Sequence, residues 1–306
     1  MAIPIHVEVN EEKILKLSKV YKEAYKSIVD EIKGATNFGV ANRKAILYQI
    51  EQILTELGND VDKFLKEEMP EYYKTGADDA VLQLTGVGAK VPVRRGFNRI
   101  HQEAINALID DTSKAFGDTL SGVNRSAQRL LGKAVREAIT QKLAEGQIGG
   151  KAMTEVKKTI KGVLQDQGLA ALVDKGGKRW ELDTYAEMLL RTKAVEARNI
   201  GLINRMAENG YDLVQVSAHW GTCPLCAPWE GKILSVSGTT KGYPTVREAE
   251  ASGLFHPNCR HAINTLIPEL AQLTAAYDNS TATKSISSER LDEINRGYFK
   301  PEVKID

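Results

Sequence analysis

Every cysteine of the chain lies in one of two short, proline-containing segments, and this clustering constrains the fold of the C-terminal part more than any other feature. The segments read CPLC at 223–226 and HPNCRH at 256–261. Each proline favours a tight turn, and such a turn directs two donor atoms at one point. The side chains with donor atoms are Cys223, Cys226, His256, Cys259 and His261.

These five side chains predict a metal site. Zinc takes four nitrogen or sulfur ligands in tetrahedral geometry, and the two segments supply one donor more than that. We predict a structural zinc site, and its ligands are Cys223, Cys226, His256 and Cys259, with His261 as the alternative fourth ligand. A closed four-ligand site contributes to folding, whereas a three-ligand site keeps a water and can catalyse.

Other interpretations of the cluster stay open. The cysteines could be unliganded core residues. A redox C-x2-C pair usually opens a helix, and Pro228 and Gly231 disfavour a helix here. A nuclease of the His-Asn-His type would need a general-base histidine, for which His219 is the candidate. The sequence contains no paired-carboxylate motif, glycine-rich phosphate loop or nucleophile elbow, so we predict that the protein is not an enzyme.

The first 205 residues carry apolar side chains at three- and four-residue spacing, which predicts a body of helices. One stripe runs from Ile14 to Ile32. A second is expected to stop at Gly58, and a third helix is expected to end near Pro70. The segment 86–96 combines glycine, proline and arginine, and it is predicted to be a loop or linker.

The pattern changes after a clear helix that begins near Asp183 and ends at Gly210. Residues 211–219 and 232–238 have the composition of strands, and 245–253 that of a short helix. The sequence therefore predicts a mainly α fold with a small C-terminal α+β module. The expected division is a helical region at 1–85, a basic helical region at 86–205, the Cys/His module at 206–270 and a weakly ordered tail at 271–306.

Charge is unevenly distributed along the chain. Residues 1–85 hold 11 Lys and Arg against 15 Asp and Glu, whereas residues 90–143 hold 10 against 5. Such a basic region could contact DNA without sequence preference, or an acidic protein surface. The residues expected to do so are Arg94, Arg95, Arg99, Arg125, Arg129, Lys133 and Arg136. The alternative is that these charges are the solvated faces of helices.

The sequence also bears on the compartment. It contains no run of 18 apolar residues, so we expect no membrane-spanning segment. The N-terminus lacks the basic and apolar stretches of a secretory signal, and three cysteines make no disulfide framework. We therefore expect the protein to be made in a reducing cytoplasm.

The order of motifs in 180–268 resembles the phage minor capsid proteins of the head-morphogenesis family, relatives of the Mu F protein. The motifs are YAEMLLRTKAVEARNIG, DLVQVSAH, CPLCAPWEGKILSVSG and GLFHPNCRHAINTLIPE. The closest likeness is to the minor capsid protein 2 branch of phages of Gram-positive bacteria. The resemblance implies a low-copy virion component at the portal vertex that acts in head assembly or DNA packaging and delivery. Its implied partners are the portal protein and, further, the major capsid or scaffold protein and DNA.

Carried over residue by residue, the resemblance covers both turns. The family's cysteine pair falls on Cys223 and Cys226, and its His-Pro-Asn-Cys step falls on 256–259. Many relatives end this step in Cys-Arg-Cys, whereas this chain has His261, which leaves the fourth ligand open. In WEGK at 229–232, Gly231 is expected in a turn and Trp229 in the core. A structural head protein is the favoured function, and a metal-dependent nuclease is the alternative.

Overall fold

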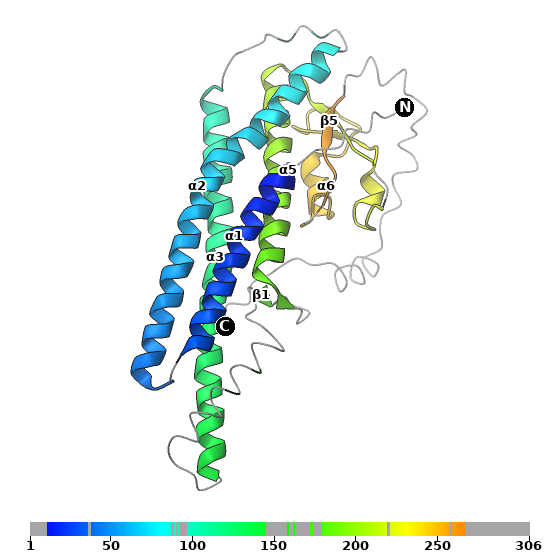
Figure 1. Cartoon of the computed structure of the whole chain (residues 1–306). Helices are drawn as coiled ribbons and strands as arrows, with labels where there is room; N and C mark the ends of the chain where they lie inside the picture. Colours follow the sequence, from blue (N-terminus) through cyan, green and yellow to red (C-terminus); the bar gives the residue numbers. More distant parts are fainter. Residues whose placement is uncertain are drawn as a thin grey trace. The chain divides into compact units, whose positions relative to one another are not determined.

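The computed structural model describes residues 11–35, 38–86, 89, 91, 97–144, 158, 162, 172–173, 179–218, 221–257 and 259–266. It is mainly helical, with a small three-stranded antiparallel sheet near the C-terminal end of this part, which confirms the predicted fold class (Figure 1). The helices are α1 (Glu11–Gly34), α2 (Val40–Gly86), α3 (Arg99–Ala144), α5 (Leu182–Glu208) and α6 (Val246–Ala251), with a 3-10 turn, η1 (Ala227–Trp229). The strands are β1 (Leu172–Val173), β2 (Arg179–Trp180), β3 (Leu213–Val216), β4 (Ile233–Ser235) and β5 (Ile263–Thr265).

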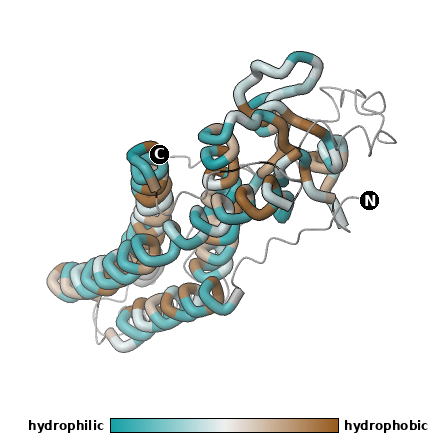
Figure 2. The backbone as a smooth tube through the Cα atoms, turned by 90° about the horizontal axis from the view of Figure 1, so that it is seen from above, coloured by the Kyte–Doolittle hydropathy of each residue, from teal (hydrophilic) through white to brown (hydrophobic). Residues whose placement is uncertain are grey.

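The helices form where the apolar spacing predicts them. In Figure 2 apolar positions recur between polar ones along the helical segments. The predicted stripe of α1 is buried, and it includes Ile14, Leu17, Tyr21, Ile28 and Ile32. The helix α5 ends just before Gly210, which has a φ of +75° and so takes the backbone conformation in which glycine commonly terminates helices.

The expected breaks at Gly58 and Pro70 are wrong, because α2 runs through both positions as one helix of 47 residues. A glycine inside a helix costs about 1 kcal/mol and a proline about 3 kcal/mol. Burial outweighs these costs, since each large apolar side chain contributes about 1.5–3 kcal/mol. The buried side chains around the two positions are Leu54, Leu57, Val61, Leu65, Met69 and Tyr73.

The chain divides into two compact units, and α2, α3 and α5 each contribute to both. The described residues of 12–64 and 112–187 form one unit, and those of 65–111 and 188–266 form the other. In the first unit the rings of Tyr21 and Phe116 lie 5.8 Å apart between centroids, and Ser18 donates a 2.7 Å hydrogen bond to Glu187.

The second unit contains the sheet, whose strand order is β4-β3-β5 with antiparallel pairing throughout. One apolar cluster joins the sheet to the neighbouring helices. Its buried members are Ala80, Leu202, Met206, Val214, Val216, Cys226, Leu234, Val246, Ala249, Leu254, Cys259 and Ile263. The strands β3 and β4 and the helix α6 were predicted, whereas β5 was not.

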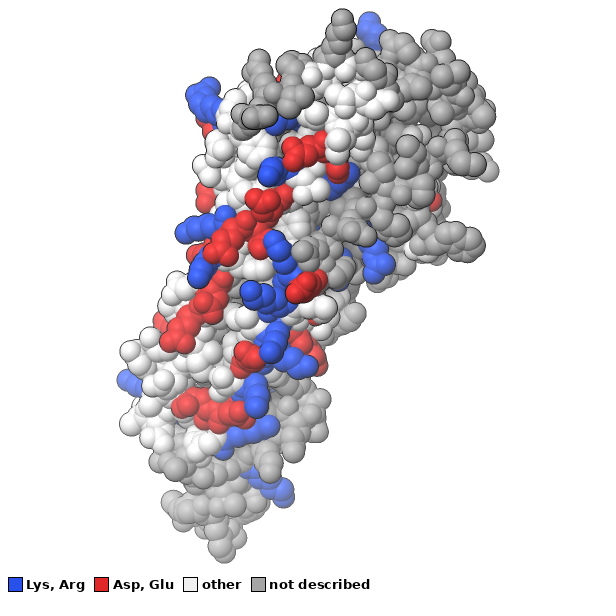
Figure 3. All heavy atoms as spheres, turned by 45° about the horizontal axis from the view of Figure 1, so that its top comes forward, with Lys and Arg blue, Asp and Glu red and all other residues white. Residues whose placement is uncertain are grey.

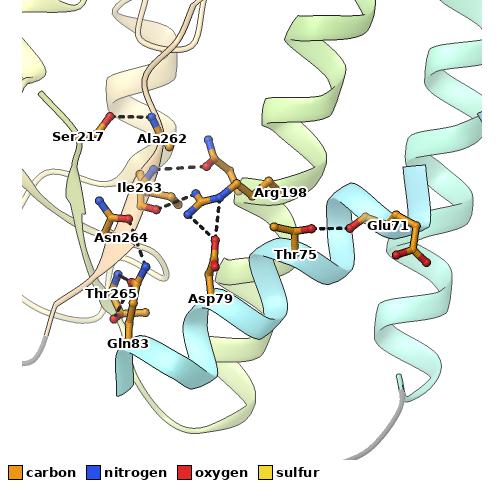
Figure 4. Close-up of polar contacts among 11 residues, drawn as sticks. Glu71, Thr75, Asp79, Gln83, Arg198, Ser217, Ala262, Ile263, Asn264 and Thr265 are labelled. Atoms are coloured by element: carbon orange, nitrogen blue, oxygen red, sulfur yellow. Dashed lines mark hydrogen bonds and ion pairs between the residues drawn. The ribbon is translucent and has the colours of Figure 1, made fainter. Parts of the chain in front are cut away.

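Among the described residues, the outer edge of β5 is bonded by side chains and not by another strand (Figure 4). Arg198 of α5 donates to the Ile263 carbonyl at 3.2 Å and holds Asp79 of α2 at 2.8 Å. The amide of Thr265 donates to Gln83 at 2.7 Å, and the amide of Ile263 donates to Asn199 at 3.4 Å. An unpaired strand edge exposes main-chain donors and acceptors, and here α2 and α5 satisfy them.

The carboxylate of Asp212 holds the loop after β4 through hydrogen bonds. Asp212 accepts hydrogen bonds from the hydroxyls of Ser235, Ser237 and Thr240 at 2.6 Å each. The following helix α6 begins with a capping box, in which Thr245 and Glu248 bond each other's backbone amides. The Asp212 hydrogen bonds and the capping box order the segment that leads through α6 to the second Cys/His turn.

Several predicted segments lie outside the described residues. The helix α2 ends at Gly86 and α3 begins at Arg99. Most of the segment predicted to be a loop or linker, 86–96, lies outside the described residues. So does the tail at 271–306. Within the part of the chain that the structure describes, no helix is long and apolar enough to cross a membrane.

Candidate metal centre

The first turn of the site lies between β3 and η1. The amides of Cys226 and Ala227 both donate to the Cys223 carbonyl, at 3.1 and 3.0 Å. The amide of Trp229 then donates to the Cys226 carbonyl at 2.8 Å, which closes η1. Within the described residues 221–257, the cysteine pair is followed directly by the 3-10 turn η1, so the α-helix that redox C-x2-C pairs usually open is absent at this position.

The second turn lies between α6 and β5. The amide of Cys259 donates to the His256 carbonyl at 2.9 Å. The chain then pairs with β3, since the amide of Ser217 donates to the Ala262 carbonyl at 2.8 Å. This pairing fixes the position of His261, which directly precedes Ala262.

The two turns bring all five predicted donor residues together. The Cys223 Sγ lies 2.9 Å from the His256 Nε2, and the Cys226 Sγ lies 3.5 Å from the Cys259 Sγ. The Cys259 Sγ lies 3.4 Å from the His261 Nδ1. The donors form two groups, Cys223–Cys226–His256 and Cys226–Cys259–His261, within each of which all donor atoms lie within 4.8 Å of one another.

This geometry suits a metal ion. Bonds of about 2.0–2.3 Å at tetrahedral angles place neighbouring zinc ligands about 3.3–3.8 Å apart, and two of the three close pairs fall in that range. Thiolate and imidazole donors favour zinc over hard cations such as calcium or magnesium. The Cys/His cluster could therefore hold a metal ion of this kind.

Each histidine has its second ring nitrogen engaged. The Nδ1 of His256 lies 2.8 Å from the Pro257 carbonyl oxygen. The Nε2 of His261 lies 3.0 Å from the Glu230 Oε1. Metal-binding histidines commonly donate their other N–H to a carbonyl or carboxylate, which fixes the tautomer and the ring orientation.

The electrostatics of the buried cysteines favour one thiolate. A hydrogen bond from Cys226, helped by bonds from His261, lowers the pKa of Cys259 well below its usual range. The same bond, together with burial, raises the pKa of Cys226. Burial favours the neutral ring of His261, but hydrogen bonds to Cys259 and Glu230 outweigh this and raise its pKa. The thiolate is the form of cysteine that binds metal.

The structure also reveals what the sequence interpretation missed. Gly231 takes the expected turn with a φ of +70°, and Trp229 packs against the apolar cluster. Between them, Glu230 was not singled out, although its carboxylate faces His261 and accepts a hydrogen bond from Thr222. The one feature of the sequence that could have pointed to Glu230 is its position in the WEGK motif at 229–232, between the two predicted turns. His219 lies outside the described residues.

The residues predicted to contact DNA or an acidic protein surface differ in their surroundings. In α3, Arg129, Lys133 and Arg136 are exposed and Arg125 is half-buried. Arg99 pairs with Glu103 at 3.6 Å, and Arg94 and Arg95 lie outside the described residues. On the face shown in Figure 3, acidic and basic side chains lie next to one another. A contact of these residues with DNA or protein stays a prediction.

The fold and the site define a helical protein with a C-terminal module built around a Cys/His cluster. The model of the phage minor capsid protein 2 family matches residues 15–296, and the chain belongs to that family. It is therefore a structural protein of a phage capsid and a component of the virion.

A second comparison agrees with this assignment. The chain is 22% identical over 142 residues to a protein named "Structural protein" of Lactococcus phage LL-H. The match covers 44% of this chain and 37% of that protein, so the chain spans well under half of this relative's length. No solved structure gave a significant match.

Proposed function

We propose that this minor capsid protein associates with the portal vertex and acts in head assembly or in DNA packaging and delivery. The family match over residues 15–296 carries the proposal. The portal protein is the first partner in this proposal, and the major capsid or scaffold protein is a further one. The long amphipathic helices suit packing against helices of such partners.

The Cys/His cluster serves this role as a structural zinc centre. Three cysteines and one histidine fill a tetrahedral shell, and no position is then left for a reactive water. The proposed ligands are Cys223, Cys226, Cys259 and His256, with His261 as the alternative to His256. In small peptides such a site contributes on the order of 10 kcal/mol to folding. In the proposed division of the chain, the metal stabilises the module at 206–270, and the protein has no catalytic turnover.

The basic residues supply a non-specific contact with DNA or with an acidic portal surface. Phosphate contacts need only positive side chains at suitable spacing, and the exposed residues of α3 offer that spacing. The protein would be assembled into heads in the host cytoplasm.

A deletion phage tests the proposal. Without the protein, heads are expected to be misassembled or poorly infective. Expression of the wild-type protein during infection should restore them, whereas purified protein added to finished particles should not, because an assembly component must be present when the shell closes. Cryo-electron microscopy of wild-type heads should show the chain at the portal. Full infectivity of the deletion phage, or rescue by late addition, would contradict the proposal.

A nuclease assay distinguishes the structural role from the alternative function, a metal-dependent nuclease. Purified protein is incubated with supercoiled DNA and added divalent metal, with Cys223→Ser as the matched variant. We expect no cleavage above that of the variant. Metal-dependent nicking that the substitution abolishes would favour an enzyme.

A further inference from the structure

The imidazole of His261 lies between the carboxylate of Glu230 and the sulfur of Cys259. Its Nε2 is 3.0 Å from the Glu230 Oε1, and its Nδ1 is 3.4 Å from the Cys259 Sγ. The residue is only 1% exposed, so water does not compete for either nitrogen. The ring therefore connects Glu230 to the cluster of donor atoms.

The carboxylate determines which ring nitrogen can bind a metal. A histidine must be neutral to bind a metal, and an ionised carboxylate only accepts hydrogen bonds, so in the metal-bound state the Nε2 of His261 carries its single proton. The lone pair then lies on Nδ1, the nitrogen that faces Cys259. This tautomer is the one that a metal in the cluster requires.

The position of Glu230 is itself fixed by the fold. Glu230 directly follows η1 and precedes Gly231, whose φ is +70°. Thr222 donates a hydrogen bond to the same carboxylate oxygen that faces His261. The turn formed by residues 229–232 thus places the Glu230 carboxylate beside the Nε2 of His261, the ring nitrogen that faces away from Cys259.

The second histidine is held differently. His256 is half-buried, and its outer nitrogen lies 2.8 Å from a backbone carbonyl, that of Pro257. Its Nε2 is 2.9 Å from the Cys223 Sγ, which is shorter than the separation of about 3.3–3.8 Å expected between zinc ligands. A closed structural site excludes water, and the buried His261 meets this condition better.

We infer that His261 is the histidine ligand of the metal centre and that Glu230 is the positioning residue that orients it. This inference rests on the proposed zinc site and names its fourth ligand. The remaining ligands are the three cysteines: Cys226 and Cys259 share a group with His261, and Cys223 shares its group with Cys226. In this arrangement Glu230 contributes to metal affinity through His261 and has no contact with the metal.

Zinc retention in the full-length protein tests the assignment. Wild type, His261→Ala, His256→Ala and Glu230→Ala are titrated with a competing chelator, and Glu250→Ala serves as a control that removes a carboxylate of α6. We expect His261→Ala to lose zinc and Glu230→Ala to weaken affinity about 10- to 100-fold, the usual loss for an outer-sphere partner. His256→Ala and Glu250→Ala should retain the wild-type zinc affinity, because in this assignment neither removes a ligand or the partner of a ligand.

A variant with a different donor shows whether Glu230 acts through the histidine. His261→Cys should retain zinc, and X-ray absorption should change from three sulfurs and one nitrogen to four sulfurs. Adding Glu230→Ala to His261→Cys should then have no further effect on zinc affinity, because a thiolate has no tautomer or ring orientation for a carboxylate to fix. A merely structural role of Glu230 would give the same loss in both backgrounds.

The outcomes separate this inference from the proposed zinc centre. Wild-type protein without zinc would overturn both. Zinc that is lost in His256→Ala and kept in His261→Ala would overturn the assignment of His261 and leave the zinc centre standing. An effect of Glu230→Ala that persists in the His261→Cys background would overturn the positioning role.

Discussion

Gly76 of α2 is in backbone contact with Arg198 of α5, so closely that a Cβ on Gly76 would lie 1.8 Å from the Arg198 carbonyl oxygen. The relationship is repeated one turn away, where a Cβ on Gly201 would lie 2.0 Å from the Tyr73 carbonyl oxygen. Both separations are far shorter than any real carbon–oxygen contact. The two helices therefore cross at a distance that only glycine permits at these positions.

Replacing Gly76 with alanine should destabilise the protein although alanine is the better helix former. The added methyl group must push α2 and α5 apart, and overpacking of this kind typically costs about 1–3 kcal/mol. Urea unfolding followed by circular dichroism measures the change. The matched control is Gly117→Ala in α3, where nothing beyond the neighbouring residues and the local helix backbone lies within 4 Å of the new Cβ and a gain of about 0.5–1 kcal/mol is expected. Equal effects of the two substitutions would argue against a tight crossing.

The crossing also places Arg198 beside β5, and this buried residue should be costly to remove. Arg198→Met leaves the Asp79 carboxylate, which is 29% exposed, without its partner and leaves the Ile263 carbonyl without this donor. Leaving a buried acceptor without its donor costs about 1–3 kcal/mol. Hydrogen exchange at β5 should accelerate. The double substitution Arg198→Met with Asp79→Leu should recover part of the loss, because no half-buried carboxylate is then left without its partner. No recovery in the double variant would contradict the assigned pairing.

The sequence predicted the helices and the Cys/His cluster because both depend on nearby residues. Helical periodicity is visible within a few turns, and the turns at Cys223 and His256 carry their own prolines. The breaks at Gly58 and Pro70 were wrong because burial against distant residues outweighs local propensity. The strand β5 was missed because its outer edge is bonded by side chains of α2 and α5, which are far away in sequence. Glu230 was missed for the same reason, since its partner His261 lies in the other turn.

Removing one metal ligand should affect the module and spare the helices. We expect about one zinc per chain in protein never exposed to chelator, measured by elemental analysis. Cys223→Ser should lose this zinc and raise hydrogen exchange in 206–266, while exchange in α1 and α3 stays close to wild type. Wild-type protein treated with chelator should behave in the same way. Uniform exchange across all helices after the substitution would show that the module is not stabilised separately.

Asp212 should make the module sensitive to acid. Burial raises the pKa of this carboxyl, but hydrogen bonds from Ser235, Ser237 and Thr240 outweigh it and hold the pKa below its usual range. Because the folded pKa lies below the unfolded value of about 3.9, the stabilisation is complete above that value. It is lost as the pH falls through the folded pKa. Asp212→Asn should lower the melting temperature at pH 7 and reduce its decline between about pH 5 and pH 2. Identical decline in both proteins would contradict this role.

The exposed basic residues of α3 should give salt-dependent binding to DNA if they contact phosphates. Arg129, Lys133 and Arg136 follow one another at four- and three-residue spacing, so they share one face of the helix. Each phosphate contact contributes about 0.9 to the slope of log affinity against log salt. Reversing the three charges to glutamate should weaken binding and lower this slope by about 3 when measured with a labelled duplex of arbitrary sequence. The control reverses Lys63, Lys66 and Lys74, three exposed lysines of α2, which changes the net charge equally. Equal losses in both variants would indicate an effect of net charge alone, and binding that does not respond to salt would remove DNA as the partner of this face.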